Sequence, residues 1–430
     1  MSGVRVRFAP SPTGLLHLGG ARTALFNYLF ARYHGGTRVL RVEDTDRARS
    51  EEAFEVALVE DLDWLGLAFD EGPYRQSERS GIYEDAIERL SEAGLTYEAV
   101  DDAGRRALYF QPSARSGSFR DELRGEVRFS GIEDFVLRKS DGTPSYNFAA
   151  AVDDAEMGIT HVIRGEEHLS NTGRQSLLYR ALGADEPRFV HLGVILGPDG
   201  KKLSKRHGDA GVADFRREGY LPEALLNYLA LLGWNHPAGK EEFEDLDKLV
   251  QEWDPSRLGA SPSTFDRDRL VSRNARQIRR LSREELRRLL EPFLEDPLPP
   301  GRELAAVEAV RDEMRTLADA PRLLREMLGS VEPASFAGEL PASSEEVLAH
   351  VIEELEFRKP EDLEDARALI AGLRAWAEER GTKTRDLLHP LRLALTGRDR
   401  GPEMAHLFAV LGTDEAQRRI ERAREARLGA

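Results

Sequence analysis

The first 46 residues alternate between strand-like and helix-like patterns, and the order of these patterns decides which sheet they can form. Val4–Ala9 alternates apolar and polar residues, as a strand does, and turn residues follow it. Apolar residues then recur at helical spacing from Gly20 to Tyr33, where Gly35-Gly36 ends the helix. Val39–Val42 is a second short strand. Strand, helix and strand in this order predict a βαβ unit and hence a parallel sheet.

Helical periodicity continues over Glu51–Leu65 and Ile82–Ala93. Residues 96–142 then interrupt the alternation, and we interpret them as an insertion into the α/β domain. Within the insertion we expect a loop and then two strands: Gln111–Ser118, Arg124–Phe129 and Asp134–Lys139. After it the alternation resumes, with one helix expected at Arg174–Leu182 and strands in the other segments: Tyr146–Val152, His161–Arg164 and Val190–Leu196.

Beyond Leu221 the pattern is almost entirely that of amphipathic helices. Stretches rich in Pro, Gly and Ser separate them, the clearest being Gly329–Ser343. The helical segments are Pro222–Leu232, Arg279–Phe293, Glu303–Leu328, Ser344–Leu355, Asp362–Arg380 and Glu415–Arg427. The sequence therefore predicts an α/β domain with a doubly wound parallel sheet, followed by an all-helical C-terminal half.

Composition excludes several kinds of site. The 430-residue chain contains no cysteine, which excludes disulfides, thiolate zinc sites, iron–sulfur clusters and cysteine nucleophiles. This fits a reducing cytoplasm, and there is no apolar run of the about eighteen residues that would span a membrane. The formal net charge of -16 argues against general attraction to nucleic acid. An RNA-binding role would therefore need a local cationic face.

The first motif lies where the first strand leads into the first helix. It reads Arg7-Phe8-Ala9-Pro10-Ser11-Pro12-Thr13-Gly14 and continues to His17-Leu18-Gly19-Gly20. A helix start offers free backbone N–H groups to a phosphate, and Gly19 and Gly20 allow a base or phosphate to approach the backbone. His17 can donate a hydrogen bond to charge on a phosphate oxygen. The alternative is that the Pro and Gly residues only shape the turn while His17 caps the helix.

The second motif is Lys201-Lys202-Leu203-Ser204-Lys205-Arg206-His207-Gly208. Four cations within six residues, in a loop flanked by glycine, suit a clamp on a triphosphate. Taken alone, such a basic loop is more often a solvated surface. Neither motif is the G-x-x-x-x-G-K-[ST] phosphate loop or the G-x-G-x-x-G dinucleotide fingerprint, so those two classes lose support.

Together the two motifs resemble the signatures of class I aminoacyl-tRNA synthetases, usually written H-I-G-H and K-M-S-K-S. Gly20 takes the last place of the first signature, and Leu203 and Arg206 replace Met and Ser in the second. Further segments are similar to the glutamyl branch of that family: Arg41–Arg47, Ser140–Ala149, Ile163–Leu169, Leu196–Gly200, Glu218–Leu225 and Leu388–Gly397. The resemblance implies a glutamyl-tRNA synthetase of bacterial type.

The resemblance also implies a role for each matching residue. The residues expected on the glutamate side are Arg7, Ala9, Ser11, Glu43, Tyr146 and Arg164, with Glu43 on the α-ammonium group. Those expected on the ATP side are His17, Gly19, Gly20, Glu167, Lys202, Ser204 and Lys205, with His17 and Lys205 as catalytic candidates. Physical reasoning agrees on the arginines, because a buried carboxylate needs a charge-assisted, preferably bidentate partner. The alternatives are an acidic helix cap at Glu43–Asp46 and a core aromatic at Tyr146.

The family's reaction has two steps, and neither needs a covalent intermediate on the protein. The glutamate α-carboxylate attacks the α-phosphorus of MgATP, and the terminal ribose hydroxyl of tRNA then takes the glutamyl group. We therefore expect ATP, Mg²⁺, L-glutamate and tRNA as partners, no zinc, and a cytoplasmic monomer. Two alternatives stay open: a paralogue that glutamylates another acceptor, and a non-catalytic RNA-binding relative. The sequence also leaves open whether glutamine acceptor tRNAs are charged.

The insertion departs from the family because it is shorter and lacks cysteine. We expect five parts: a first catalytic half (1–95), the insertion (96–142), a second catalytic half (143–236), a stem-contact region (237–328) and an anticodon-binding domain (329–430). With a short insertion, the grip on RNA should come from the helical half. The candidate arginine runs are Arg269–Arg280 and Arg322–Arg325, each of which could equally be a solvated helix face.

Overall fold

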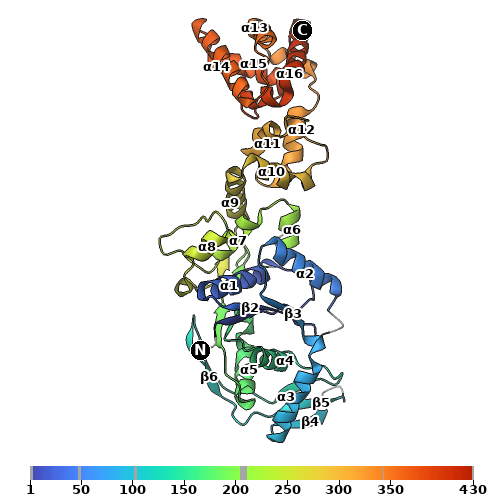
Figure 1. The fold of residues 1–430 in the computed structure, drawn as a ribbon, viewed down its shortest axis with the longest axis vertical. Coiled ribbons are helices and arrows are strands. Elements are labelled where there is room, and N and C mark those ends of the chain that lie inside the picture. Colours follow the sequence, from blue (N-terminus) through green and yellow to red (C-terminus); the bar gives the residue numbers. More distant parts are fainter. Residues whose placement is uncertain (1–2, 47–49, 101–103, 204–210, 342, 429–430) are drawn as a thin grey trace. The chain divides into compact units, whose positions relative to one another are not determined.

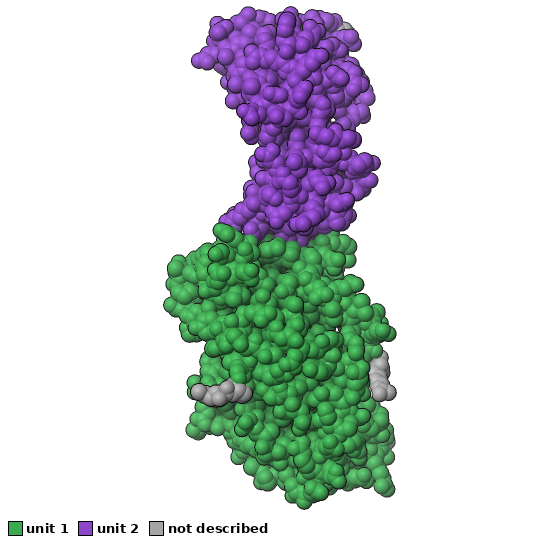
Figure 2. Space-filling view, viewed as in Figure 1, with its two compact units in different colours: residues 1–217, 222–270 green, residues 218–221, 271–430 purple. Residues whose placement is uncertain are grey.

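The structure is a computed structural model that describes residues 3–46, 50–100, 104–203, 211–341 and 343–428 (Figure 1). The chain forms two compact units, which Figure 2 shows in different colours. The first contains residues 1–217 and 222–270, and the second contains residues 218–221 and 271–430. The predicted candidate site lies in the first unit.

A seven-stranded sheet forms the centre of the first unit, in the order β3-β2-β1-β9-β10-β6-β7. All neighbours are parallel except β6 and β7, which pair antiparallel. The strands are β1 (Arg5–Phe8), β2 (Thr37–Val42), β3 (Glu71–Arg75), β6 (Gly117–Asp121), β7 (Gly125–Phe129), β9 (His161–Gly165) and β10 (Arg188–Leu192). Because β2 and β3 lie on one side of β1 and β9 and β10 on the other, the strand order reverses between β1 and β9. Ligands bind at the carboxyl ends of strands at such a reversal.

Helices cover both faces of this sheet. The helices of the first unit are α1 (Leu18–His34), α2 (Glu52–Trp64), α3 (Ser80–Glu92), α4 (Tyr146–Glu156), α5 (Leu169–Ala181), α6 (Val212–Arg217), α7 (Pro222–Ala230) and α8 (Leu246–Glu252). Side chains of α3, α4 and α5 share one apolar core with strand residues such as Val39, Val162 and Phe189. Helix α1 lies against β1, β2 and β9 and packs on α7 and α8. Figure 1 shows α1 on the opposite side of the sheet from α4 and α5, as a doubly wound fold requires.

Two smaller sheets complete the first unit. The antiparallel sheet β4-β5-β8 consists of Thr96–Val100, Arg106–Phe110 and Phe135–Arg138. A short parallel pair joins β11 (Ile195–Leu196) to β12 (Ser263–Thr264). Residues 96–142 are thus divided between two sheets, since β6 and β7 extend the main sheet while β4, β5 and β8 form their own.

The second unit is helical. Its helices are α9 (Arg267–Arg280, which begins in the first unit), α10 (Arg283–Leu290), α11 (Glu303–Arg311), α12 (Ala320–Leu328), α13 (Ser344–Phe357), α14 (Leu363–Glu379), α15 (Thr384–Thr396) and α16 (Met404–Leu428). Helix α16 packs against α11, α13, α14 and α15. It bends at Gly412, whose φ of 74° lies in the left-handed region that favours glycine. The buried Arg419 donates to the carbonyls of Met327, Leu328 and Leu395, and so satisfies acceptors at two helix ends.

The predicted fold class is confirmed, with one segment of the wrong type, one predicted helix that is two (Glu303–Leu328 forms α11 and α12), and several omissions. Tyr146–Val152, expected as a strand, lies in helix α4. Its residues from Phe148 onward are buried on all sides, and a short continuous apolar run does not separate a buried helix from a buried strand. The sequence did not predict β3, β4, β5, α6, α8, most of α9 or α15, and β6 begins two residues inside the expected loop Gln111–Ser118. Helix α15 contains Pro390, which ordinarily argues against a helix interior.

Candidate active site

The predicted glutamate-side residues gather at the carboxyl ends of the central strands. Arg7 lies near the end of β1, Arg164 near the end of β9, and Glu43 directly after β2. All three act on the phenol of Tyr146: burial raises its pKa most, Glu43 raises it further, and Arg164 and Arg7 lower it. The sequence prediction and the strand reversal thus indicate the same place.

A buried network of ion pairs supports this cluster. Asp154 Oδ1 accepts hydrogen bonds from Arg7 Nε (3.0 Å) and Arg41 Nη1 (2.6 Å). Arg41 Nη2 donates in turn to Glu43 Oε1 (3.1 Å). Burial alone would raise the pKa of Asp154, yet the two guanidiniums hold it below its usual value. For Glu43 burial outweighs Arg41 and Arg7, and its pKa is raised.

The neighbouring Asp153 belongs to the same support. Its carboxylate accepts hydrogen bonds from Gln76 Nε2 (2.8 Å), Arg79 Nε (2.7 Å) and the Tyr83 hydroxyl (2.9 Å). Neither Asp153 nor Asp154 is among the site residues that the sequence predicts. The available signal was two adjacent carboxylates directly after the apolar run Phe148–Val152, because buried carboxylates require cationic partners.

The loop after β1 is tied to the end of β2 through backbone bonds. Glu43 N–H donates to Pro10 O (2.9 Å), which places Ala9 and Ser11 beside the Glu43 segment. The alternative interpretation of Glu43–Asp46 as an acidic helix cap does not hold for Asp44. Its carboxylate instead accepts hydrogen bonds from the Ser77 N–H (2.8 Å) and the Ser77 hydroxyl (2.5 Å). Helix α2 starts after Glu51, which makes no side-chain cap.

Arg164 has an unusual environment for a buried cation. Nε donates to His191 Nε2 (3.3 Å), and Nη2 donates to Thr172 Oγ1 and Gln175 Oε1 (2.8 Å each). All three partners are neutral side chains when His191 is unprotonated, and Nη1 has no partner in the described part of the chain. The side chain is 5% exposed, and among the described residues it forms no ion pair. Burial lowers the pKa of Arg164, as expected for a cation without a direct counter-ion.

The ATP-side candidates form a second cluster at the start of α1. His17 is the N-cap of α1, and its Nδ1 accepts the Gly20 N–H (3.1 Å). This bond fixes the other ring nitrogen, Nε2, as the donor of the neutral imidazole. The ring is exposed at the surface, but neighbouring protein displaces enough water to lower the pKa of His17, and Lys202 lowers it further. A Cβ at Gly19 would meet the His17 ring at 3.1 Å, so glycine leaves room for this ring position.

Glu167 and Lys202 lie beside His17. Lys202 Nζ is 2.9 Å from Glu167 Oε1, and Glu167 raises the pKa of His17 where Lys202 lowers it. Both side chains of this ion pair are well exposed, so the pair itself adds little stability. Phosphates can therefore replace Glu167 as the partner of Lys202 at low cost.

The structure ties one end of the basic loop to β11 and the other end to the first motif. Leu203 N–H donates to Ile195 O (2.8 Å), and Val212 N–H donates to Leu16 O (2.8 Å), directly before His17. His17 and Gly211 also form an isolated bridge. The candidates Ser204 and Lys205 lie outside the described residues, and their roles stay predictions. Of the described residues that flank them, Lys202 and Gly211 both lie close to His17.

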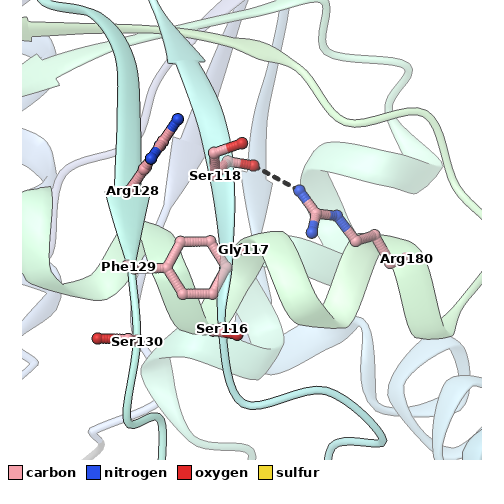
Figure 3. Close-up of a pocket in the computed structure, with 7 residues that line it drawn as sticks. All are labelled: Ser116, Gly117, Ser118, Arg128, Phe129, Ser130 and Arg180. Atoms are coloured by element: carbon pink, nitrogen blue, oxygen red, sulfur yellow. Dashed lines mark hydrogen bonds between the residues drawn. The ribbon is translucent and has the colours of Figure 1, made fainter.

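A surface pocket of about 600 Å³ lies elsewhere, at the β6–β7 hairpin (Figure 3). It is lined by Ser116, Gly117, Ser118, Arg128, Phe129, Ser130 and Arg180. Arg180 Nη2 donates to Ser118 O (2.5 Å) and to Glu186 Oε2 (3.2 Å), so its charge is already paired. None of the predicted site residues lines this pocket, and we place the candidate active site at the strand ends instead.

Two further findings concern metals and membranes. Within the described ranges, no group of three or more His, Asp or Glu side chains is arranged to hold a metal ion. No described helix combines the length and the apolar character that crossing a membrane demands.

Comparisons with known proteins agree with this geometry. A profile for the catalytic domain of class I tRNA synthetases (E and Q) matches residues 3–105 and 106–272, and an anticodon binding domain profile matches residues 281–424. Glutamate–tRNA ligase 1 of Rubrobacter xylanophilus is 67% identical over 427 residues, which is 99% of each chain. Glutamate–tRNA ligase 1 of Fervidobacterium nodosum is 39% identical over 470 residues, covering 98% of this chain and 99% of its own.

Solved structures show the same likeness. The glutamate tRNA ligase of Elizabethkingia meningosepticum, in complex with its amino acid, has a TM-score of 0.86 and 30% identity, over 99% of both chains. The glutamate-tRNA synthetase of Elizabethkingia anophelis has a TM-score of 0.84 and 31% identity, over 99% of this chain and 100% of its own. With family profiles over most of its length and relatives along nearly all of it, the chain belongs to the class I tRNA synthetases of the glutamate and glutamine (E and Q) group.

Proposed function

We propose that this chain is a glutamate–tRNA ligase, which activates L-glutamate with ATP and transfers the glutamyl group to the 3′-terminal ribose of tRNA. The observation that carries the proposal is Arg164, a buried guanidinium with neutral partners and a free Nη1 in the described part of the chain. A buried cation of this kind is stabilised when an anionic ligand supplies the missing counter-ion. Arg7 also acts on Arg164 but is already paired with Asp154, so Arg164 is the cation of this cluster that a substrate carboxylate suits.

The remaining residues of the cluster fit the other groups of glutamate. Glu43 offers a carboxylate to the α-ammonium group, with Ala9 and Ser11 in the adjoining loop. The Tyr146 hydroxyl, 3.1 Å from His168 Nδ1, is held where it can contact the substrate. Burial and then Arg164 lower the pKa of His168 to about 4, so its ring is neutral at pH 7.

In the first step the glutamate α-carboxylate attacks the α-phosphorus of ATP, and pyrophosphate leaves. His17 donates from Nε2 toward the phosphates, at the helix start where free N–H groups and Gly19 and Gly20 favour an anion. Lys202 lies beside this place, and we assign Ser204 and Lys205 to the same clamp. Mg²⁺ enters as the counter-ion of ATP. Positioning and charge stabilisation supply the catalysis, and no residue forms a covalent intermediate.

In the second step the terminal ribose hydroxyl of tRNA attacks the acyl carbon of glutamyl-adenylate, and AMP leaves. The match of residues 281–424 to an anticodon binding domain supports the tRNA terminus as the acceptor, over the alternative of a paralogue that glutamylates another acceptor. We keep the finer division into residues 1–95, 96–142, 143–236, 237–328 and 329–430 as part of the proposal. By likeness to the family we also propose a monomer that works in the cytoplasm.

The deciding experiment is ATP–pyrophosphate exchange with glutamate, with and without total tRNA, followed by aminoacylation of purified glutamate and glutamine tRNAs. We expect glutamate-dependent exchange and a charged glutamate tRNA. Exchange without any aminoacylation would favour another acceptor, and absence of both activities would favour a non-catalytic RNA-binding protein.

A further inference from the structure

One of the three neutral groups that hold Arg164, the imidazole of His191, is itself held by a carboxylate from a distant part of the chain. His191, in β10, offers Nε2 to Arg164 Nε (3.3 Å) and turns Nδ1 toward Asp121 Oδ2 (2.6 Å). Asp121 is the last residue of β6, seventy positions before His191. Both side chains are 0% exposed, so water does not complete their hydrogen bonds. Asp121, His191 and Arg164 therefore form one buried chain of contacts.

The hydrogen-bond inventory fixes which nitrogen of His191 carries the proton. Asp121 Oδ1 accepts the N–H groups of Leu123 and Arg124 (2.9 Å each), and Oδ2 accepts the His191 N–H (3.2 Å). A carboxylate saturated with donors stays ionised, and the pKa of Asp121 is lowered despite its burial. His191 Nδ1 must then donate to Asp121. An arginine nitrogen only donates, so His191 Nε2 must accept.

Thr172 is compatible with this proton arrangement. Its hydroxyl accepts from Arg164 Nη2 (2.8 Å), and its single proton has two acceptors within reach, His168 O (3.2 Å) and His191 Nε2 (3.0 Å). A protonated His191 would instead turn an N–H toward the Arg164 Nε–H and the Thr172 hydroxyl. Burial, partly offset by Asp121, keeps the pKa of His191 low, which agrees with a neutral ring.

We propose that His191, fixed as the Nδ1–H tautomer by Asp121, is a positioning residue that aims Arg164 Nη1 at a substrate carboxylate. The inference rests on the proposed function and adds a residue and a proton position to it. A neutral acceptor orients the guanidinium without neutralising it, so the counter-ion must come from the substrate. A carboxylate in the place of His191 would orient Arg164 equally well, but it would remove the need for an anionic ligand.

The contact between Asp121 and His191 also gives the β6–β7 hairpin a place in the site. Asp121 belongs to the segment interpreted as an insertion, and β6 pairs with β10 in the main sheet at Phe189 and Asp121. Arg124, in the same turn, donates to His191 O (2.5 Å) and to Glu166 Oε2 (2.6 Å). The β6–β7 hairpin is thereby part of the framework behind the amino-acid pocket.

Two amide substitutions test the two contacts of the His191 ring separately, Nδ1 with Asp121 and Nε2 with Arg164. In His191→Asn the amide nitrogen takes the place of Nδ1 and keeps the bond to Asp121, while the acceptor for Arg164 is lost. In His191→Gln the amide reaches the place of Nε2 and can accept from Arg164. His161→Asn, at the opposite end of the neighbouring strand β9, is the matched control. Glutamate-dependent ATP–pyrophosphate exchange in the presence of total tRNA gives KM for glutamate, KM for ATP and kcat, and thermal melting gives stability.

We expect His191→Asn to raise KM for glutamate about tenfold, the change that corresponds to about 1.4 kcal/mol, with KM for ATP within about twofold of wild type. Discrimination against glutamine should weaken in parallel, and His191→Gln should restore most of the loss. Asp121→Asn keeps the side chain's shape but presents an amide N–H to Nδ1, which forces the wrong tautomer, and it should act like His191→Asn. Asp121→Asn tests the positioning role of His191 if His191→Asn does not fold.

The outcomes separate the inference from the function beneath it. If the wild-type protein shows no glutamate-dependent exchange, the proposed function fails first. If the wild type is active but neither His191→Asn nor Asp121→Asn changes KM for glutamate more than His161→Asn does, the positioning role is wrong. A uniform loss of kcat and of both substrate affinities, with no rescue by His191→Gln, would also overturn it, because that is the result of a purely structural role.

Discussion

Arg41 Nη1 lies 2.6 Å from Asp154 Oδ1, and both side chains are almost completely buried, at 0% and 1% exposure. The same carboxylate oxygen holds Arg7, which the proposed function places on the substrate. Asp154 therefore links a structural arginine to a substrate-binding one, and removing it would leave two buried guanidiniums without a shared partner.

Asp154→Ala should destabilise the first unit by about 3–5 kcal/mol, because it leaves buried charges uncompensated. The matched control is Glu156→Ala on the same helix, which breaks only the exposed pair with Arg89 (3.5 Å) and should cost less than about 1 kcal/mol. In a Trp376→Phe background the remaining tryptophans, Trp64, Trp234 and Trp253, all belong to the first unit, so fluorescence in urea follows that unit alone. Equal losses for the two variants would contradict this account of the ion network.

Arg164→Ala should lower glutamate activation chiefly through KM for glutamate, by about 10- to 100-fold, since a hydrogen bond to a charged group contributes about 1.5–3 kcal/mol. Wild-type protein should strongly prefer glutamate to glutamine, because the neutral amide leaves Arg164 uncompensated. Arg180→Ala is the control, as Arg180 lies on α5 but lines the hairpin pocket of Figure 3. The measurement is ATP–pyrophosphate exchange with each amino acid in the presence of tRNA. If glutamine competes with glutamate on equal terms, Arg164 does not recognise the side chain of the amino-acid substrate.

Much of this site could be predicted from strand ends, and the rest could not. Arg7, Glu43 and Arg164 end or follow strands, and the carboxyl ends of parallel strands meet at one edge, so local patterns suffice to bring them together. Asp121 and His191 are different, because their contact depends on β6 joining the main sheet beside β10, a pairing between distant segments. No periodicity in residues 111–121 indicates that pairing, and the sequence predicts a loop for Gln111–Ser118. A related reason applies to Asp153 and Asp154, because the sequence predicts a strand for the run before them and the structure has a helix there.

Lys205→Ala should reduce the rate of glutamate activation by about 10²-fold while changing ATP affinity much less, because a clamp on the leaving pyrophosphate acts mainly in the transition state. Lys205 lies outside the described residues, and the prediction rests on its place in Lys-Leu-Ser-Lys-Arg and on Gly211, at the end of the loop, forming a bridge with His17. Lys201→Ala, in the same loop but outside the signature, is the control. Pre-steady-state rates and ATP binding measured separately give the answer, and near-normal turnover in Lys205→Ala would end this role.

Two buried groups in the first unit should give its stability opposite dependences on pH. Burial lowers the pKa of His161 to about 4, against about 6.5 in an unfolded chain. Between these values only the unfolded chain binds the proton, so this contribution to stability is lost as pH falls. Burial raises the pKa of Asp61 from 3.8 to about 6. Between those two values only the folded chain binds the proton at Asp61. The Asp61 contribution is therefore lost as pH rises.

The corresponding variants should change the pH slope in opposite directions. Between pH 4.5 and 6, His161→Asn should flatten the loss of stability on acidification, and Asp61→Asn should steepen it, each by at most about 1.4 kcal/mol per pH unit. Urea unfolding of the Trp376→Phe protein at several pH values measures both slopes. Slopes that move in the same direction for the two variants would show that these groups do not titrate as their burial implies.

The last prediction concerns how an acidic protein holds tRNA. Arg322 and Arg325 lie one turn apart on α12, but neither is a bare cation: Arg322 Nη1 is 3.0 Å from Glu326 Oε1, and Arg325 Nη1 is 2.5 Å from Glu295 Oε2.

Both side chains of the Arg325–Glu295 pair are well exposed, at 59% and 67%, so the pair is weak and a phosphate can displace Glu295. If α12 contacts RNA, Arg325→Ala should weaken tRNA binding and reduce the slope of log affinity against log salt by about one. Glu295→Ala should strengthen tRNA binding with little change in the salt slope, since Arg325 then makes the same phosphate contact without first losing Glu295. Filter binding of total tRNA by the full-length protein at several salt concentrations measures both, with Arg89→Ala in the first unit as the control. Because counter-ion release ties each phosphate contact to the salt slope, an unchanged slope in Arg325→Ala together with unchanged affinity in Glu295→Ala would remove α12 from the RNA-binding surface.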